Sequence, residues 1–391
     1  MAPSENRPGV AVESFPPPAD PVFRTGVAGF VCPAYGPGLG SLPVARLFTS
    51  WPDFAATYRD RQDWLASTWH PDDVAWHSVQ GFFANGGSRC WVALYDPGVT
   101  GDPRLALSTG VSTLIEIDDV DLVCAPSLAA QPGSLALQLV QQLVRDAEFR
   151  DDWFLILDAP SPGQDVAAWV AALRAAPSNR PQNAAVYHPW LVPGGDVEPA
   201  PRAATAMVPA SGHVAGIFAR TDTRIGVHTA PANEAIDGIV DVTADVGDIA
   251  GANPIRAYPG RGIRVWGART LAVATSPTDP SAYIGVRRLV LTLDRWLVRA
   301  LDWTVFETND VRTWVRIHRE LNQRLTALFE QGAFQGSTQD QAFYVKCDDE
   351  NNPPDVRTKG ELHVDVGIAA AVPKEFIKIR LVRSAEGITV A

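Results

Sequence analysis

The first half of the chain alternates short apolar runs with stretches of helical periodicity. The apolar runs cover residues 90–94, 120–124, 153–157 and 184–188. Consecutive apolar positions of this kind are typical of strands that are buried on both faces of a sheet. Helices are expected between them, one from an Asp72 or Asp73 cap to Asn85, one over 134–148 and one over 164–176. The alternation predicts a mostly parallel sheet with crossover helices.

The second half contains two long helical patterns. The first covers residues 283–301, and the second follows an Asn309 or Asp310 cap and ends at Gln331. The apolar stripe expected on the second helix comprises Val311, Trp314, Val315, His318, Leu321, Leu325, Leu328 and Phe329. Because His318 falls on this stripe, we expect it to be a core residue with satisfied hydrogen bonds.

Both ends of the chain are expected to be extended. Residues 1–22 contain six prolines, which favour extended backbone, with one short strand over Val10–Glu13. The segment Phe376–Arg383 has two different faces. Its apolar face consists of Ile377, Ile379 and Leu381, and its basic face of Lys378 and Arg380 together with Lys374. A terminal strand with a basic face is expected at a sheet edge or in the sheet of another molecule.

Charge is distributed unevenly along the 391 residues, which carry a net −11. Residues 1–210 have 12 arginines and 22 acids, a net of −10, and the rest has 21 basic and 22 acidic residues, a net of −1. An acidic surplus disfavours proteins that coat nucleic acid or anionic membranes. With 46% hydrophobic and 20% charged residues the composition is that of a globular protein, and the length predicts two or three domains.

The cysteines and the N-terminus give no sign of secretion. Cys32, Cys90, Cys124 and Cys347 have no paired spacing, so we expect buried thiols in a chain made in the cytoplasm. The N-terminus lacks the apolar region of a signal peptide. No window approaches the roughly 18–20 continuous apolar residues of a spanning helix, so no membrane insertion is expected.

Motifs for cofactors and anions are weak. Gly36-Pro37-Gly38-Leu39-Gly40 lacks the lysine and the free N–H groups of a phosphate loop, so it is interpreted as a turn. The acidic run over 348–352 lacks the glycine and the final glutamate of a calcium loop. Arg261 and Arg264 flank Gly262 in a segment where Ile263 and Val265 alternate with Arg264 and Trp266, and an interface or solvated role is favoured for them. No cofactor or metal is expected.

A hydrolase in the α/β region is the main catalytic alternative. Its candidate residues are Asp158, Asp165, His188, Ser211 and His213. The chain contains no G-x-S-x-G nucleophile elbow, and none of its serines has a recognisable context at a helix start. A working triad is therefore disfavoured.

After residue 208, a series of unusual strings follows in one order. The strings are Val208-Pro-Ala-Ser-Gly-His-Val-Ala-Gly-Ile217, Ala219-Arg-Thr-Asp222, Gly226-Val-His-Thr-Ala-Pro-Ala-Asn-Glu234, Asn253-Pro-Ile-Arg256, Pro259-Gly-Arg-Gly262, Val265-Trp-Gly-Ala-Arg-Thr-Leu271, Tyr283-Ile-Gly-Val-Arg-Arg-Leu289, Val305-Phe-Glu-Thr-Asn-Asp310, Phe343-Tyr-Val-Lys-Cys-Asp348 and Asn352-Pro353. As an ordered set they resemble the tail sheath family of contractile phage tails, R-type pyocins and extracellular contractile injection systems. Pro8-Gly-Val-Ala-Val-Glu13 resembles the start of that family, and 25–40, 81–91 and 185–190 fit its middle portion more loosely.

The resemblance implies an α/β chain, α+β overall, in four parts. An extended N-terminal arm occupies 1–22, and an outer α/β domain with a mostly parallel sheet occupies 23–207. An inner α+β domain with two long helices, next to a tube, occupies 208–375. A C-terminal strand arm occupies 376–391, although the tail over 387–391 is not closely matched.

The function that the resemblance implies is structural rather than enzymatic. Family members polymerise helically around an inner tube and contract to drive that tube through a target envelope. The implied partners are other copies of the chain, the inner tail tube protein, and baseplate and tail terminator proteins. The chain would be part of a phage tail or a phage tail-like particle, assembled in the cytoplasm and in some particles released from the cell.

Two sets of residues are assigned roles through this resemblance. Strand arms exchanged between subunits would contain Val10 and Val12 at one end and Ile377, Ile379 and Leu381 at the other. Contact with the tube would fall to Arg312, Arg316 and Arg319, which lie along one side of the second long helix. A cytoplasmic hydrolase and a non-contractile shell or adhesin protein stay open as alternatives, as does the kind of particle, whether phage, bacteriocin or toxin injector.

Overall fold

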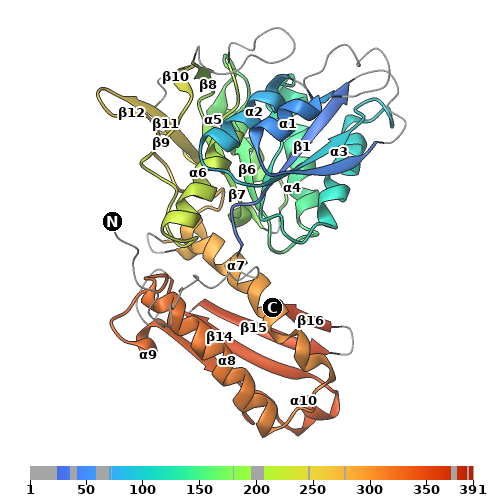
Figure 1. Cartoon of the computed structure of the whole chain (residues 1–391), viewed down its shortest axis with the longest axis vertical. Coiled ribbons are helices and arrows are strands. Elements are labelled where there is room, and N and C mark those ends of the chain that lie inside the picture. Colours follow the sequence, from blue (N-terminus) through green and yellow to red (C-terminus); the bar gives the residue numbers. More distant parts are fainter. Residues whose placement is uncertain are drawn as a thin grey trace, which may run out of the picture.

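The computed structural model describes residues 24–35, 42–58, 70–71, 73–178, 180–194, 207–244, 247–276, 279–370, 377–384 and 387–390. Within them the chain forms a large body built on a mixed sheet and a small body built on an antiparallel sheet (Figure 1). The helix α7 (Ile284–Leu301) runs from the large body into the small one. Val10–Glu13 and the Gly36–Gly40 turn lie outside the described residues.

The sheet of the large body has the strand order β2-β4-β1-β5-β6-β7-β11-β12-β9. Neighbours from β4 to β11 are parallel, whereas β2, β12 and β9 run antiparallel to their neighbours. The bounds are β1 (Ala28–Tyr35), β2 (Val44–Phe48), β4 (Cys90–Tyr95), β5 (Leu122–Cys124), β6 (Phe154–Asp158), β7 (Ala184–His188), β9 (Glu234–Ala235), β11 (Ala252–Tyr258) and β12 (Gly262–Val265). The prediction of a mostly parallel α/β sheet is confirmed.

Short strands lie beside this sheet and helices cover both of its faces. β3 (His70–Pro71) pairs with β1, and β8 (Leu191–Pro193) pairs with β10 (Ile239–Val242). One face is covered by α1 (Trp51–Tyr58), α2 (Asp73–Ala84) and α6 (Ser211–Arg224), and the other by α3 (Pro103–Ile115), α4 (Gly133–Ala147) and α5 (Val166–Ala175). The result is a three-layer body with one apolar core on each side of the sheet (Figure 1).

Two glycines allow α2 and α6 to touch through their backbones. A Cβ atom at Gly212 would lie 2.1 Å from the carbonyl oxygen of Ser78, and one at Gly216 would lie 2.4 Å from that of Phe82. Any larger residue would push the two helices apart and disrupt the close packing of this core. The string Val208–Ile217 therefore has a packing reason for its glycines.

The large body extends well beyond the expected boundary at residue 207. α6 packs in one of its cores, and β11 pairs in parallel with β7, so that Asn253 lies opposite Tyr187. The expected division into 23–207 and 208–375 is therefore corrected, because residues 208–283 complete the large body. The hydrophobic cores divide along α7, where Ile284 and Leu291 face the large body and Leu293 and Leu297 face the small one.

The small body is a four-stranded antiparallel sheet, among the described residues, with helices packed on it. Its order is β13 (Phe343–Lys346), β14 (Leu362–Ile368), β15 (Ile377–Ser384) and β16 (Gly387–Val390). α7 and α8 (Val311–Glu330) share its apolar core, and the short α9 (Gln339–Ala342) and α10 (Pro354–Thr358) lie in the connections. The two long helices are where the sequence predicts them, and the carboxylate of Asp310 caps α8 by accepting the N–H groups of Arg312 and Thr313.

The buried side of α8 differs from the predicted stripe. Its buried residues are Thr313, Trp314, Ile317, Leu321, Leu325 and Leu328. Val311 and Val315 are 63% and 64% exposed. His318, expected in the core, is exposed and contacts the amide nitrogen of Asn322. The expected stripe is therefore wrong at these three positions, because α8 turns Ile317 rather than its N-terminal valines toward the sheet.

The C-terminal strand β15 is not an edge strand in this chain. It pairs with β14 on one side and β16 on the other. Ile379 and Leu381 are buried in the core of the small body, and Ile377 packs against that core. The expectation of an edge strand is therefore corrected. The basic residues beside them, Lys378 and Arg380, both pair with Asp365 of β14.

A buried arginine fastens α7 to the large body. The side chain of Arg288 is 3% exposed, and its guanidinium donates to both carboxylate oxygens of Asp222, at 2.7 and 2.6 Å, and to Asp121 at 3.0 Å. Asp121 also accepts the backbone N–H groups of Gly26 and Val27. Burial disfavours the charge, but the two carboxylates outweigh it and raise the pKa of Arg288, so its guanidinium stays charged.

A second arginine makes a similar contact two turns along the same helix. Arg295 donates to the carboxylate of Asp152 at 2.7 Å and to the carbonyl oxygen of Val120 at 2.9 Å. Residues seven apart lie on the same face of a helix, so Arg288 and Arg295 grip the same side of the large body. We call this pair of contacts the arginine clamp.

Replacing Arg288 with Met should lower the free energy of unfolding by about 3–5 kcal/mol, because Asp121 and Asp222 would keep buried charges without a counter-ion. Urea denaturation of the purified chain measures this loss. Arg299→Met on the same helix is the matched control, since Arg299 is more exposed and makes one hydrogen bond, to the carbonyl oxygen of Asp118. Equal losses in the two variants would contradict the role given to Arg288.

Candidate assembly surfaces

The serine and aspartate considered for hydrolysis hold a helix in place. Asp158 ends β6 and accepts the backbone N–H of Ser211 at 2.7 Å. Burial raises the pKa of Asp158 to about 7. Ser211 begins α6 and has no exposed surface. Asp158 therefore positions the first turn of α6 against the sheet, and the Ser211 hydroxyl offers no surface to a substrate.

The remaining candidates for a triad also have local structural roles. Asp165 caps α5 by accepting the N–H of Ala168. His188 ends β7 and is buried, and burial lowers its pKa. His213 lies on α6 with its ring against the backbone of Gly81, where a Cβ atom would approach it to 2.3 Å. Burial first, and the neighbouring His77 second, lower the pKa of His213 to about 3, so its imidazole is neutral at physiological pH.

The structure assigns no metal site to the acidic run or to the cysteines. Asp348 accepts the N–H groups of Glu350 and Asn351, which makes the run a local turn. All four cysteines are buried free thiols. In the described parts of the chain, no group of three or more His, Cys, Asp and Glu side chains is arranged to hold a metal ion. Nor is any described helix long and apolar enough to cross a membrane.

The three arginines proposed for tube contact line the outer side of α8. Arg312, Arg316 and Arg319 are all exposed. The guanidinium of Arg316 lies 3.7 Å from the centre of the Trp303 ring, which fixes it over the preceding 3-10 turn. The exposed Val311 and Val315 lie beside them on the same helix. Sequence reasoning placed these valines in the core, so it missed that the surface is both basic and apolar.

The small sheet has two open edges within the described part of the chain. β13 pairs only with β14, and β16 pairs only with β15. Each therefore presents a row of backbone N–H and C=O groups to which another strand can add. Of the residues expected in exchanged strands, Ile377, Ile379 and Leu381 lie in β15 of the chain's own sheet, while Val10 and Val12 are outside the described residues.

The chain is similar to solved structures over nearly its whole length. It is 26% identical to a chain of the anti-feeding prophage baseplate structure, with a TM-score of 0.71, and the match covers 95% of this chain and 98% of that one. It is also 26% identical to a chain of the contracted sheath complex of PVC, an extracellular contractile injection system, with a TM-score of 0.65 and coverage of 96% and 97%.

Two curated proteins that are similar in sequence are named as tail sheath proteins. The chain is 28% identical over 185 residues to the tail sheath protein of Vibrio phage KVP40, a match that covers 45% of this chain and 26% of that protein. It is 25% identical over 268 residues to a putative prophage major tail sheath protein of Pseudomonas aeruginosa strain UCBPP-PA14, covering 66% of this chain and 64% of that protein. No family model matches the chain.

In sequence and in fold the chain is similar to contractile tail sheath proteins. Its match spans about a quarter of the phage KVP40 sheath protein and just under two thirds of the Pseudomonas protein.

The stability of the folded chain should fall as the pH drops from about 6.5 toward 4, in part because of His213. The unfolded chain binds a proton at this histidine near pH 6.5, whereas the folded chain resists it down to about pH 3. Urea midpoints across this range should therefore fall less steeply in His213→Gln than in the native chain.

Val214→Ala is the matched control for this pH experiment. Val214 is buried beside His213 on α6 but carries no titratable group. The change should lower stability by a similar amount at every pH. A His213→Gln variant that keeps the full native slope would contradict the assignment of a buried neutral imidazole.

Proposed function

We propose that the chain is the protomer of a contractile tail sheath, which polymerises helically around an inner tube and contracts to drive that tube through a target envelope. The observation that carries this proposal is the match over 95% of the chain to components of contractile injection systems. Self-association and attachment to a baseplate follow from the same likeness. The inner tube protein and a tail terminator are the further partners that we propose.

In this proposal each protomer moves as one rigid block during contraction. The arginine clamp supports this, because Arg288 and Arg295 tie α7 to three aspartates of the large body, while other side chains of α7, among them Leu293, pack in the core of the small body. Contraction is then a rearrangement of contacts between blocks rather than a refolding of each block. No nucleotide is required for a step whose energy is stored when the sheath is assembled.

The large body is the outer domain and the small body the inner one in this proposal. With the corrected boundary, residues 24–283 form the outer domain and 284–370 the helices and first strands of the inner domain. Residues 1–22 form an arm that reaches a neighbouring subunit. The open edges of β13 and β16 are suitable acceptors for such an arm, since β-strand addition gains affinity from backbone hydrogen bonds.

The C-terminal segment that we propose to be exchanged between subunits is shorter than the one that the sequence suggests. β15 forms seven register pairs with β14, and its apolar residues fill the core of the same chain. Removing β15 would leave that core open, so we propose that exchange between subunits involves β16. The β16 strand is short and borders solvent on one edge, which makes its transfer less costly.

Deleting residues 1–20 should block sheath assembly while leaving a folded chain, because these residues form the arm that we propose to reach a neighbouring subunit. Sedimentation and negative-stain microscopy measure assembly, and circular dichroism of the soluble fraction checks the fold. Full-length sheaths from the shortened chain would refute the arm proposal. Discrete monomers from the native chain, labelled by a serine-reactive probe, would instead favour a hydrolase.

Replacing both Arg312 and Arg316 with Glu should give sheaths that polymerise without the tube, because two cations of the exposed α8 surface become anions. Co-sedimentation with the purified tube protein measures attachment. Arg145→Glu is the control, since Arg145 is an exposed helical arginine of the large body whose guanidinium donates to the side chain of Gln142. Unchanged tube attachment in the double variant would refute the tube-contact role.

A further inference from the structure

The β11–β12 hairpin projects from one end of the large sheet and presents an unusual set of exposed side chains (Figure 1). Its two strands bury Ile255, Ile263 and Val265 on the face turned to the core. The opposite face carries Tyr258 and the 41% exposed Trp266, whose rings lie 4.8 Å apart. Tryptophan, tyrosine and arginine are the residues most enriched at the energetic centres of protein interfaces.

The arginines of this hairpin lack a full set of acidic partners. Arg264 lies directly opposite Arg256 in the strand pair. Two like charges in such a position repel each other and destabilise the pair. Arg256 is paired with Asp248 at 2.7 Å. Among the described residues, Arg264 donates to the carbonyl oxygens of Arg261 and Asn233, and Arg261 donates to the side chain of Asn233. These neutral contacts orient both guanidiniums but leave their charge uncompensated.

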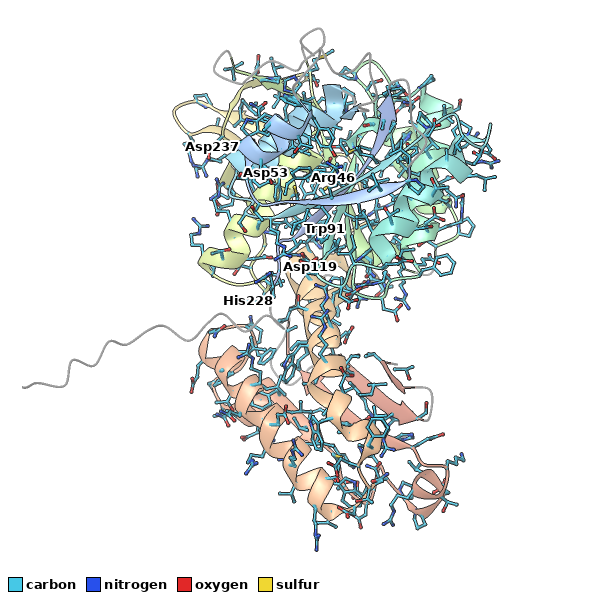
Figure 2. All side chains as sticks on the ribbon, turned by 45° about the vertical axis from the view of Figure 1, so that its right-hand side comes forward. Arg46, Asp53, Trp91, Asp119, His228 and Asp237 are labelled. Carbon is cyan, nitrogen blue, oxygen red and sulfur yellow. The ribbon has the colours of Figure 1, made fainter. Side chains whose placement is uncertain are left out.

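The opposite end of the same sheet contains a groove with a glutamate in its lining and two aspartates close to it in sequence. A cavity of 710 Å³ lies between the start of β2, Trp91 of β4 and the last turns of α3, where Glu116 lines it. Two residues on, outside the lining itself, Asp118 is 83% exposed and forms a long ion pair of 3.7 Å with Arg150. Asp119 accepts a hydrogen bond from the indole of Trp91 and pairs with Arg89. In Figure 2, Trp91 and Asp119 lie near the middle of the view, and Asp237, which follows β9, lies to their upper left.

We propose that the β11–β12 hairpin of one copy docks in the β2–α3 groove of the next copy. Two complementary surfaces at opposite ends of one sheet make a head-to-tail contact, and such contacts build rings or open helices rather than closed dimers. Arg261 and Arg264 meet Glu116 and Asp118, and Tyr258 and Trp266 cover the apolar floor beside Val44 and Ala45. This inference rests on the proposed self-assembly and adds a lateral contact between large bodies to it.

A charge-swap experiment tests the contact. The critical concentration for polymerisation of the purified full-length chain is measured by sedimentation and checked by negative-stain microscopy. Arg261→Glu with Arg264→Glu should raise it at least about tenfold, because like charges then face each other across the contact. Glu116→Lys with Asp118→Lys should do the same, and combining all four changes should restore assembly. Arg145→Glu should leave it unchanged.

The outcomes separate this inference from the proposed function. A native chain that forms no polymer under any condition contradicts the sheath proposal. A native chain that polymerises, with both charge variants doing so equally well, overturns the hairpin contact alone. The variant with all four changes is checked by circular dichroism. If it is folded but does not regain assembly, the pairing of these two surfaces is also overturned.

A crosslinking measurement gives a readout that does not depend on polymer formation. A photoreactive phenylalanine analogue at position 261 is placed in the native chain, which is then mixed at high concentration with an isotopically labelled copy. Crosslinks from 261 to residues 105–119 or 43–45 of the labelled copy are expected. Crosslinks that fall elsewhere, or none between copies, would refute the contact.

Discussion

The arrangement of the chain depends on the buried ion cluster around Arg288. Hydrophobic packing alone gives α7 an apolar stripe on each side, since Leu291 contacts one core and Leu293 the other. Apolar contacts are non-directional and tolerate sliding. A guanidinium that must meet Asp222 and Asp121 with five well-oriented donors allows one register only. The ion cluster therefore fixes how α7 leaves the large body, which is what the proposed rigid protomer requires.

Local patterns in the sequence predict most elements but not their partners. The buried strands near residues 90, 122, 154 and 184 and both long helices lie where periodicity places them, because burial on two faces and an i, i+3, i+4 stripe are local signals. The pairing of β7 with β11 is not local, since a helix and several turns separate the two strands in sequence. The domain boundary was misplaced at residue 207 for this reason.

The sequence also predicts only part of which side chains lie on the candidate assembly surfaces. Arg312, Arg316 and Arg319 are recognisable from their spacing, and they are exposed as expected. Val311 and Val315 fit the apolar stripe equally well by spacing, yet they are exposed, whereas Trp314 and Ile317 beside them face the core. The Arg256 and Arg264 pair becomes visible only when the strands are placed in register. A side chain is exposed when no other element packs against it. A pattern within one sequence does not show which elements pack together.

The large body extends to residue 283, and this changes where the uneven charge of the sequence lies in the structure. Residues 211–283 carry six arginines and seven acids, so they are nearly neutral, whereas residues 1–210 carry a net −10. Because 211–283 include the hairpin end of the large sheet and 1–210 include the β2 end, the imbalance runs along one sheet rather than between two domains. An outer wall made of such bodies placed head to tail would alternate acidic and neutral ends. Repulsion between neighbours in the wall is then lowest in the orientation that brings Arg261 toward Glu116, so electrostatics favours the polar, helical order over any random packing.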